Sequence, residues 1–398
     1  MKVALVHDWL TGMRGGEKVL EALCEVFPQA DIFTLLHIPG SVSEAIEKRE
    51  IKTSFIQKLP LLKKHYRTFL PLFPAAVERF DFTGYDLVVS TSHCVAKGVI
   101  TPPGTVHVSY IFTPMRYIWD KYNDYFAPER VGRLKGKALQ AIAHYLRIWD
   151  VNSSSRVDAF IAISDYVAER VYKYYRRPST VVYPPVECAR FDLSRRWPED
   201  FYLCVSAFAP YKRLDLAVEA FNTLGARLKI AGTGQDEKRL RRMAGPNIEF
   251  LGSPADEEIS ALYSRCKALV FPGEEDFGIV PLEAMASGAP VIAYGKGGAL
   301  ETVVPMNGPD RGSPGPPKAP TGVFFYEQTP GDLVEAVKLF EKNEKVFNPR
   351  ALRARALEFD TALFKKRIKE EILKLQREHA SGEKCLKNTA SFLKTSFS

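Results

Sequence analysis

The feature that most constrains this chain is an alternation of short apolar runs with helix-period segments, which occurs twice along its 398 residues. Such an alternation is typical of a parallel β-sheet with crossover helices. Between the two series stands the stretch 183–186 (YPPV), in which two prolines remove two backbone donors and impose an extended chain. The pattern therefore predicts an α/β protein with two doubly wound, Rossmann-like domains facing a central cleft.

The first series predicts strands at residues 3–7, 31–35, 87–90, 106–111, 159–162 and 181–183, and helices at 17–26, 131–150 and 165–175. The second predicts strands at 202–206, 226–231, 248–251, 268–271 and 290–293, and helices at 213–224, 236–244, 256–264, 280–286 and 330–342. We therefore expect one domain over 1–186 and a second over 187–348. A helical segment over 349–378 and a disordered tail over 379–398 follow, and the Pro- and Gly-rich stretch 305–320 is expected to be a surface loop.

Composition narrows the class and the compartment. With 46% hydrophobic and 26% charged residues, a disordered chain, a collagen and a small disulfide scaffold are excluded. The six cysteines are far apart and form no CxxC pair, which predicts buried free thiols in a reducing, cytoplasmic compartment. The N-terminal apolar run is too short for a signal peptide, and no apolar run reaches the roughly 18 residues of a membrane span. Any membrane contact is therefore expected to be peripheral.

Several catalytic motifs are missing. The Gly232-Thr233-Gly234 triplet is followed by Glu237 where a dinucleotide-binding loop needs its third glycine. The chain has no GxxxxGK[ST], HExxH or GxSxG motif, and no Asp-x-Asp pair of the kind that holds a divalent ion on a sugar diphosphate. We therefore expect no cofactor and no metal.

A glycine-rich turn follows the first expected strand, in the stretch 12–17 (GMRGGE). Adjacent glycines at 15 and 16 allow close approach of the backbone to a ligand, and the start of a helix presents free N–H groups that suit a phosphate. A tight strand-to-helix turn explains the glycines alone equally well.

Two cations open a helix after the first strand of the second series, at Lys212 and Arg213. Cations are disfavoured at a helix N-terminus by the helix dipole, and a bound anion relieves that conflict. Solvated basic residues are the usual explanation of such a pair, but this position favours neutralisation of a diphosphate.

The most informative stretch is 271–284 (FPGEEDFGIVPLEA), in which a strand ends, an acidic loop follows and a helix begins. Glu275 lies on the loop and Glu283 about one turn into the helix, so the first suits sugar hydroxyls and the second a ribose diol. The amides near Gly278 and Ile279 suit a phosphate. Charge compensation at the helix N-terminus accounts for the acids but not for the glycine loop or the helical glutamate.

These residues carry a resemblance to a known family. The stretch 275–303 (EDFGIVPLEAMASGAPVIAYGKGGALETV) resembles the motif of retaining GT-B glycosyltransferases of glycosyltransferase family 4. So do 7–23 (HDWLTGMRGGEKVLEAL), 206–221 (SAFAPYKRLDLAVEAF) and 247–263 (NIEFLGSPADEEISALY), particularly in its bacterial polysaccharide mannosyltransferase-like members. The resemblance covers residues 1 to about 370.

The resemblance implies a role for each matching residue. Glu275 and Lys212 would be catalytic, with Glu275 on the donor sugar and Lys212 on the diphosphate. The implied donor-binding residues are Gly16, Arg213, Gly252, Gly278, Ile279, Val280 and Glu283. The substrate would be a nucleoside diphosphate sugar, with a lean towards GDP-mannose, and the first domain would hold a glycan or lipid-linked acceptor for cell-surface polysaccharide synthesis. The final helix would cross back onto the first domain.

Two positions depart from the family pattern. Ala207 stands where many relatives have arginine, and Phe112 stands where relatives commonly have a histidine near the anomeric centre. Phenylalanine neither donates a hydrogen bond nor stabilises charge. His93 is a candidate substitute, although a structural histidine explains it too.

On the acceptor side the candidates are Gly15, His93, Thr113 and Arg116. Because of Phe112, a non-catalytic nucleotide-sugar-binding or scaffold protein stays as the alternative to a hexosyltransferase. A nucleotide-sugar epimerase has only the fold in its favour.

The net charge of +8 is unevenly placed. Residues 52–79 hold six cations and one carboxylate, and residues 58–74 (KLPLLKKHYRTFLPLFP) mix cations with Leu and Phe. That mixture fits peripheral contact with an anionic inner membrane surface, and equally fits a solvated face. No nucleic-acid-binding motif accompanies the charge, so nucleic acid is not expected as a partner.

Overall fold

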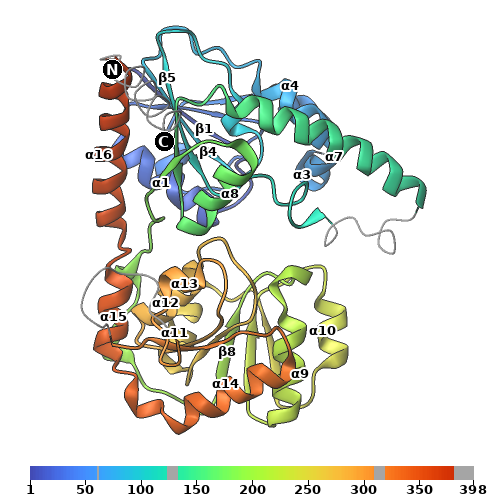
Figure 1. Cartoon of the computed structure of the whole chain (residues 1–398), viewed down its shortest axis with the longest axis vertical. Helices are drawn as coiled ribbons and strands as arrows, with labels where there is room; N and C mark the ends of the chain where they lie inside the picture. Colours follow the sequence, from blue (N-terminus) through green and yellow to red (C-terminus); the bar gives the residue numbers. More distant parts are fainter. Residues whose placement is uncertain (61, 123–132, 309–318, 381–398) are drawn as a thin grey trace, which may run out of the picture. The chain divides into compact units, whose positions relative to one another are not determined.

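The computed structural model describes residues 1–60, 62–122, 133–308 and 319–380, and the chain separates into two compact units. Unit 1 comprises Met1–Pro185 and the described residues from Phe364 on, and unit 2 comprises Val186–Leu363. Each unit is built on a parallel sheet with helices packed against it (Figure 1). The predicted α/β fold with two doubly wound parts is thus confirmed. Residues 381–398 of the predicted tail and 309–318 of the predicted loop lie outside the described residues.

Unit 1 has a seven-stranded sheet in the order β3-β2-β1-β4-β5-β6-β7. The strands are β1 (Val3–His7), β2 (Asp31–Thr34), β3 (Ile51–Thr53), β4 (Leu87–Ser92), β5 (Val106–Ile111), β6 (Ala159–Ala162) and β7 (Ser179–Val181). Every residue of β1, β4 and β5 is buried, as expected for central strands covered on both faces. The chain reverses direction across the sheet between β1 and β4, so the loops after these two strands diverge there.

The α-helices of unit 1 are α1 (Gly15–Val26), α2 (Glu44–Glu47), α3 (Leu62–His65), α4 (Phe73–Val77), α7 (Arg133–Ser154), α8 (Asp165–Tyr175) and most of α16 (Thr361–Ala380). Short 3-10 helices are η1 (Phe55–Lys58), η2 (Tyr66–Leu72) and η3 (Ala96–Gly98). The α16 helix lies beside α1, where Lys365 donates to Glu25, and its Phe364 ring packs edge-on against Tyr110 (Figure 1).

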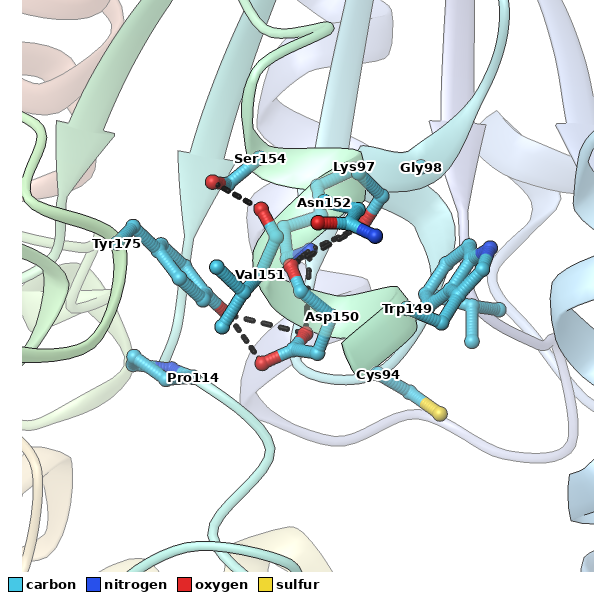
Figure 2. Close-up of polar contacts among 12 residues, drawn as sticks. Cys94, Lys97, Gly98, Pro114, Trp149, Asp150, Val151, Asn152, Ser154 and Tyr175 are labelled. Atoms are coloured by element: carbon cyan, nitrogen blue, oxygen red, sulfur yellow. Dashed lines mark hydrogen bonds and ion pairs between the residues drawn. The ribbon is translucent and has the colours of Figure 1, made fainter. Parts of the chain in front are cut away.

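A buried ion pair holds α7 to the segment after β4. Lys97 Nζ lies 3.1 Å from Asp150 Oδ1 and donates to the Asp150 carbonyl and to Ser153 Oγ, both at 2.7 Å. The Asp150 carboxylate also accepts from the Tyr175 hydroxyl at 2.9 Å (Figure 2). It accepts from Trp119 Nε1 as well, at 2.8 Å. Both charged side chains are excluded from water, and burial lowers the pKa of Lys97 despite the neighbouring carboxylate.

Unit 2 has a six-stranded sheet in the order β10-β9-β8-β11-β12-β13. Its strands are β8 (Tyr202–Val205), β9 (Leu228–Ala231), β10 (Ile248–Gly252), β11 (Leu269–Phe271), β12 (Val291–Tyr294) and β13 (Gly322–Phe325). The α-helices are α9 (Leu214–Leu224), α10 (Glu237–Met243), α11 (Asp256–Arg265), α12 (Ile279–Ala286), α13 (Ala299–Thr302), α14 (Pro330–Lys342) and α15 (Pro349–Leu357). The 3-10 helices are η4 (Cys188–Arg190), η5 (Leu193–Arg195), η6 (Pro210–Lys212) and η7 (Glu344–Val346). The strand order reverses between β8 and β11, which is where ligands bind in open parallel sheets.

Three strands differ from the prediction. The edge strand β3 was not expected, because its three residues are only partly buried and form no apolar run. The edge strand β13 was not expected either, because it directly follows the Pro- and Gly-rich stretch. The last strand of unit 1 is β7 rather than residues 181–183, because it pairs with β6 before the two prolines remove the donors that a ladder needs.

The segment expected as one helix over 349–378 consists of two helices. Between α15 and α16 the backbone of Val186 exchanges hydrogen bonds with Phe359 and Thr361 at 3.0 and 3.1 Å, which holds this stretch extended. Asp360 then caps α16 by accepting from the Ala362 amide at 2.9 Å. The chain thus passes to unit 1 after α15, and α15 itself packs against α12 in unit 2.

The described cysteines agree with the expectation of buried free thiols. The five described cysteines are buried and free of disulfides, and Cys385 lies outside the described residues. No helix in the described part of the chain is long and apolar enough to cross a membrane.

Candidate functional site

The loops after β8 and β11 bring the two predicted catalytic residues together in unit 2. Lys212 ends the 3-10 helix η6 after β8, and Glu275 lies on the loop after β11. Lys212 Nζ donates to Glu275 Oε1 and forms an ion pair with it. The side chains are 19% and 15% exposed, so water reaches both. A small pocket lies here, lined by Ser206, Lys212, Gly273 and Glu275 among others.

Arg213 is held in a strained conformation beside this pair. Its φ of 53° and ψ of 37° place a non-glycine residue in the left-handed region at the start of α9, at a cost of about 1–3 kcal/mol. Its Nε donates to Asp215 and its Nη1 to the side-chain oxygen of Gln328, both at 3.3 Å. Strain of this kind is characteristic of functional sites, where surrounding contacts hold the residue in place.

Glycines let the neighbouring loops touch backbone to backbone. A Cβ on Gly273 would lie 3.0 Å from the Lys212 carbonyl oxygen, and one on Gly297 would lie 2.5 Å from the Glu275 carbonyl oxygen. Gly298 donates to that same carbonyl at 2.9 Å, and a Cβ there would lie 2.2 Å from the Phe277 Cα. The loop after β12 therefore fixes the backbone of the acidic loop that carries Glu275.

The helix α12 begins where the sequence places the amide donors. Gly278 adopts φ 95° as its N-cap, and Ile279 and Val280 are its first residues. Glu283, one turn further on, accepts a hydrogen bond from the Tyr263 hydroxyl at 3.0 Å. Burial raises the pKa of Tyr263, so this hydroxyl stays protonated and orients the Glu283 carboxylate.

The Gly-Thr-Gly triplet has a packing role in this structure. A Cβ on Gly232 would lie 1.9 Å from the Ser206 carbonyl oxygen, and one on Gly234 would lie 2.5 Å from that of Phe208. Gly252, at the end of β10, has φ 69° with open space around it, so its backbone conformation is the reason for glycine there.

In unit 1 the residues singled out by the sequence gather around Phe112. A Cβ on Gly16 would lie 3.4 Å from both His7 Cε1 and Phe112 Cε2, and Gly15 is the first residue of α1. The Phe112 ring centroid lies 6.3 Å from that of His93 and 6.4 Å from that of His7. Two histidine rings therefore lie near Phe112, and the Tyr110 ring lies closer still at 5.7 Å.

Asp8, which the sequence analysis did not single out, organises the loop after β4. Its side chain is fully buried and accepts from the backbone amides of His93, Cys94, Val95 and Ala96 at 2.7–2.9 Å. It also lies 3.1 Å from His93 Nδ1. A carboxylate directly after a fully buried strand is the sequence signal that could have identified it.

Glu17 and His7 form a second buried pair at the start of α1. Burial alone would raise the pKa of Glu17, but the His7 ring and the Arg14 guanidinium outweigh it and hold the pKa below its usual value. Glu17 also accepts from the Arg14 amide at 3.1 Å, which caps the helix.

The remaining acceptor-side candidates lie after β5. Thr113 is buried and its hydroxyl donates to the Pro114 carbonyl at 3.0 Å, while Arg116 is half-buried. Within the described residues, no group of three or more His, Cys, Asp or Glu side chains is arranged to hold a metal ion.

Two family profiles match the chain. "Glycosyltransferase Family 4" matches residues 13–190, and "Glycosyl transferases group 1" matches residues 187–356. Their junction falls within a few residues of the boundary between the two units.

Known proteins with similar sequence or structure agree with this match. An uncharacterized glycosyltransferase, MJ1178 of Methanocaldococcus jannaschii, is 23% identical over 76% of this chain and 79% of its own length. The human alpha-1,3/1,6-mannosyltransferase ALG2 is 30% identical over 49% of this chain, which spans about half of ALG2 (52%). The Anabaena protein HepE, solved in complex with UDP, superposes with a TM-score of 0.67 at 16% identity, covering 94% of this chain and 100% of HepE. The chain therefore belongs to glycosyltransferase family 4 and has the GT-B fold.

Proposed function

We propose that this protein transfers a hexose from a nucleoside diphosphate sugar to a hydroxyl of a glycan or lipid-linked acceptor, with retention of the anomeric configuration. The observation that carries the proposal is the Lys212–Glu275 pair at the β8–β11 switch point. GDP-mannose is the proposed donor and mannose the transferred sugar, because relatives of this chain are named as mannosyltransferases.

The chemistry follows from charge placement. When the bond between the anomeric carbon and the diphosphate breaks, negative charge grows on the diphosphate. Lys212 and Arg213 stabilise that charge without reorganisation, together with the amides that open α12. We propose that no metal ion takes part, that Glu275 binds sugar hydroxyls and that Glu283 binds the ribose. The leaving phosphate oxygen takes the proton of the attacking hydroxyl.

Phe112 favours a second candidate function, that of a GT-B protein that binds a nucleotide sugar without turning it over. Its ring centroid lies 6.4 Å from that of His7 and 6.3 Å from that of His93, and the ring offers no hydrogen bond. The Phe112→His variant separates the two candidates. If the natural protein is inactive and Phe112→His turns the nucleotide sugar over, the natural protein has lost an activity. If the natural protein itself shows turnover, the second candidate is rejected.

We also propose that unit 1 contacts an anionic membrane surface on the inner face of the plasma membrane. The stretch 58–74 covers part of η1, α3, η2 and the start of α4. Within it Arg67 is exposed and lies over the Tyr66 ring at 5.4 Å, and Leu72 is exposed too. The side chains of Lys63 and Lys64 lie outside the described residues. Sedimentation with phosphatidylglycerol vesicles should be lost when Lys63, Lys64 and Arg67 become Ser, and unchanged binding rejects the membrane proposal.

The function is tested by screening nucleotide sugars by thermal shift and then by transfer, in buffer with EDTA. One sugar nucleotide should raise the melting temperature and support transfer, with GDP-mannose expected. A thermal shift without transfer to any glycan or lipid acceptor supports the second candidate. No shift with any nucleotide sugar contradicts both.

A further inference from the structure

We propose that Gln328 is a positioning residue for the donor diphosphate, holding Arg213 and the loop after β11 through the two ends of one amide. This inference rests on the proposed function, because it assigns Gln328 to the same site. Gln328 lies just before α14, and the sequence analysis did not single it out.

The Gln328 amide joins two loops that are far apart in sequence. Its Nε2 donates to the Pro272 carbonyl at 3.0 Å, and its Oε1 accepts from Arg213 Nη1 at 3.3 Å. Pro272 directly follows β11, and Arg213 lies between η6 and α9. The amide therefore links the segments that follow β8 and β11, each of which carries a candidate catalytic residue.

The turn that carries Gln328 is itself fixed. The Asp332 carboxylate accepts from the amides of Tyr326 and Glu327 at 2.9 and 2.8 Å, and the Thr329 hydroxyl accepts from the Asp332 amide at 3.2 Å. Because the backbone on both sides of Gln328 is held, its side chain has a fixed position from which it orients Arg213 and the Pro272 carbonyl.

The Gln328 amide satisfies both contacts because it donates at Nε2 and accepts at Oε1. A carboxylate accepts from Arg213 but has no proton for the Pro272 carbonyl, and a cationic side chain donates but does not accept. Asp215 accepts from Arg213 Nε, so the guanidinium is held at two of its three nitrogens. Among the described residues its Nη2 has no partner, and this nitrogen is the one available to a phosphate oxygen.

The test is a double-mutant cycle on nucleotide affinity. Calorimetric titration with GDP, UDP and ADP measures the dissociation constant for the natural protein, Gln328→Leu, Arg213→Ala and the double variant. For the nucleotide that binds, Gln328→Leu should weaken affinity about tenfold in the natural background and less than about twofold in the Arg213→Ala background. Equal weakening in both backgrounds, or none, overturns the proposal.

The matched control is Asn307→Asp, compared with Gln328→Glu. Asn307 also bridges backbone with its amide, to Phe324 N and O at 3.0 and 2.8 Å, and neither of these bonds involves a site residue. Gln328→Glu should weaken nucleotide binding and speed hydrogen exchange at residues 273–278, whereas Asn307→Asp should do neither. Equal effects of the two variants reduce Gln328 to a structural residue and overturn the proposal.

Failure of the proposed function gives a different result. If the natural protein binds none of the three nucleotides, both the donor site and the role of Gln328 at a diphosphate are rejected. If the natural protein binds one of them and the cycle is additive, only the role of Gln328 is rejected.

Discussion

Two lysine–carboxylate pairs in this molecule have the same chemistry and opposite surroundings. Lys97–Asp150 in unit 1 is closed to water, with two further hydrogen bonds to the ammonium and the rings of Trp149 and Tyr175 within 5.3 Å of it. Lys212–Glu275 in unit 2 is 19% and 15% exposed and borders a pocket.

The difference shows which pair can exchange partners. The buried ammonium has no solvated route for a phosphate, and separating it from Asp150 would leave an uncompensated charge in a medium of low dielectric constant. The Lys212–Glu275 pair is only half-buried and is reached by water, so a diphosphate that is more highly charged than one carboxylate competes for Lys212. We therefore expect a structural role for the first pair and propose a binding role for the second.

The largest expected effect comes from breaking the buried pair. Lys97→Ala should lower the free energy of unfolding of unit 1 by about 3–5 kcal/mol, because Asp150 is left buried without a counter-charge. The loss in free energy of unfolding is measured by urea denaturation, with hydrogen exchange at residues of unit 1 as the readout. Lys48→Ala, which removes the partner of Glu44 in an exposed pair, is the control and should cost less than about 1 kcal/mol. Equal losses in the two variants would refute the structural role.

The next effect is on turnover. Lys212→Ala should reduce sugar transfer by about 10²–10³-fold, since it removes one donor to the leaving diphosphate. The control is Lys229→Ala, because Lys229 is also half-buried (21% exposed) and lies 3.6 Å from Glu249, on β9 and away from the switch point. The sugar-transfer rates of the two variants are compared, provided that their melting temperatures are equal. A similar loss of transfer in both would count against a specific role for Lys212.

Lowering the pH should affect the stability of the two units differently, through histidine protonation in unit 1. All seven histidines lie in unit 1, and burial lowers the pKa of His107 to about 4 from 6.5. Below pH 6.5 the unfolded chain binds this proton more tightly, so the stability of unit 1 should fall as the pH drops from 6.5 to 4. The loss is about 3 kcal/mol from this residue and does not grow further below pH 4.

Hydrogen exchange at pH 7 and pH 5 measures this loss in each unit separately. Protection, taken relative to the intrinsic exchange rate at each pH, should fall in unit 1 of the natural protein more than in a His107→Gln variant. Unit 2 should show no such histidine-dependent change. An identical pH response of the two proteins would contradict the assignment to His107.

The smallest expected effect is on the stability of unit 2. Glu275→Gln should change its free energy of unfolding by no more than about 1 kcal/mol, because the pair with Lys212 is reached by water. Asp150→Asn in unit 1 is the contrasting variant and should cost several times more. The urea midpoints of the two variants are compared directly. A large loss of stability in Glu275→Gln would mean that the Lys212–Glu275 pair has a structural role.

The sequence was sufficient for most of the fold and for the residues at strand ends. Fully buried strands such as β1 leave continuous apolar runs, and Lys212 and Glu275 were predicted because each follows a central strand. The edge strands β3 and β13 were missed, since short or partly exposed strands leave no such run.

The supporting residues of the site were not predictable in the same way. Tyr263 looks like a core residue of an amphipathic helix, and Gln328 like part of a polar turn. Each contacts a residue on another loop or helix, and such long-range pairing leaves no local pattern. Asp8 is similar, because its four amide partners lie more than 80 residues further along the chain.

The central claim is that the donor diphosphate binds at the half-buried Lys212–Glu275 pair. Calorimetric titration of GDP and UDP into the natural protein and into Lys212→Ala, with EDTA present, tests it most directly. We predict that one of the two nucleotides binds the natural protein and binds Lys212→Ala at least about tenfold more weakly, with melting temperatures unchanged. Equal affinity for both proteins, or no binding to the natural one, would contradict the claim.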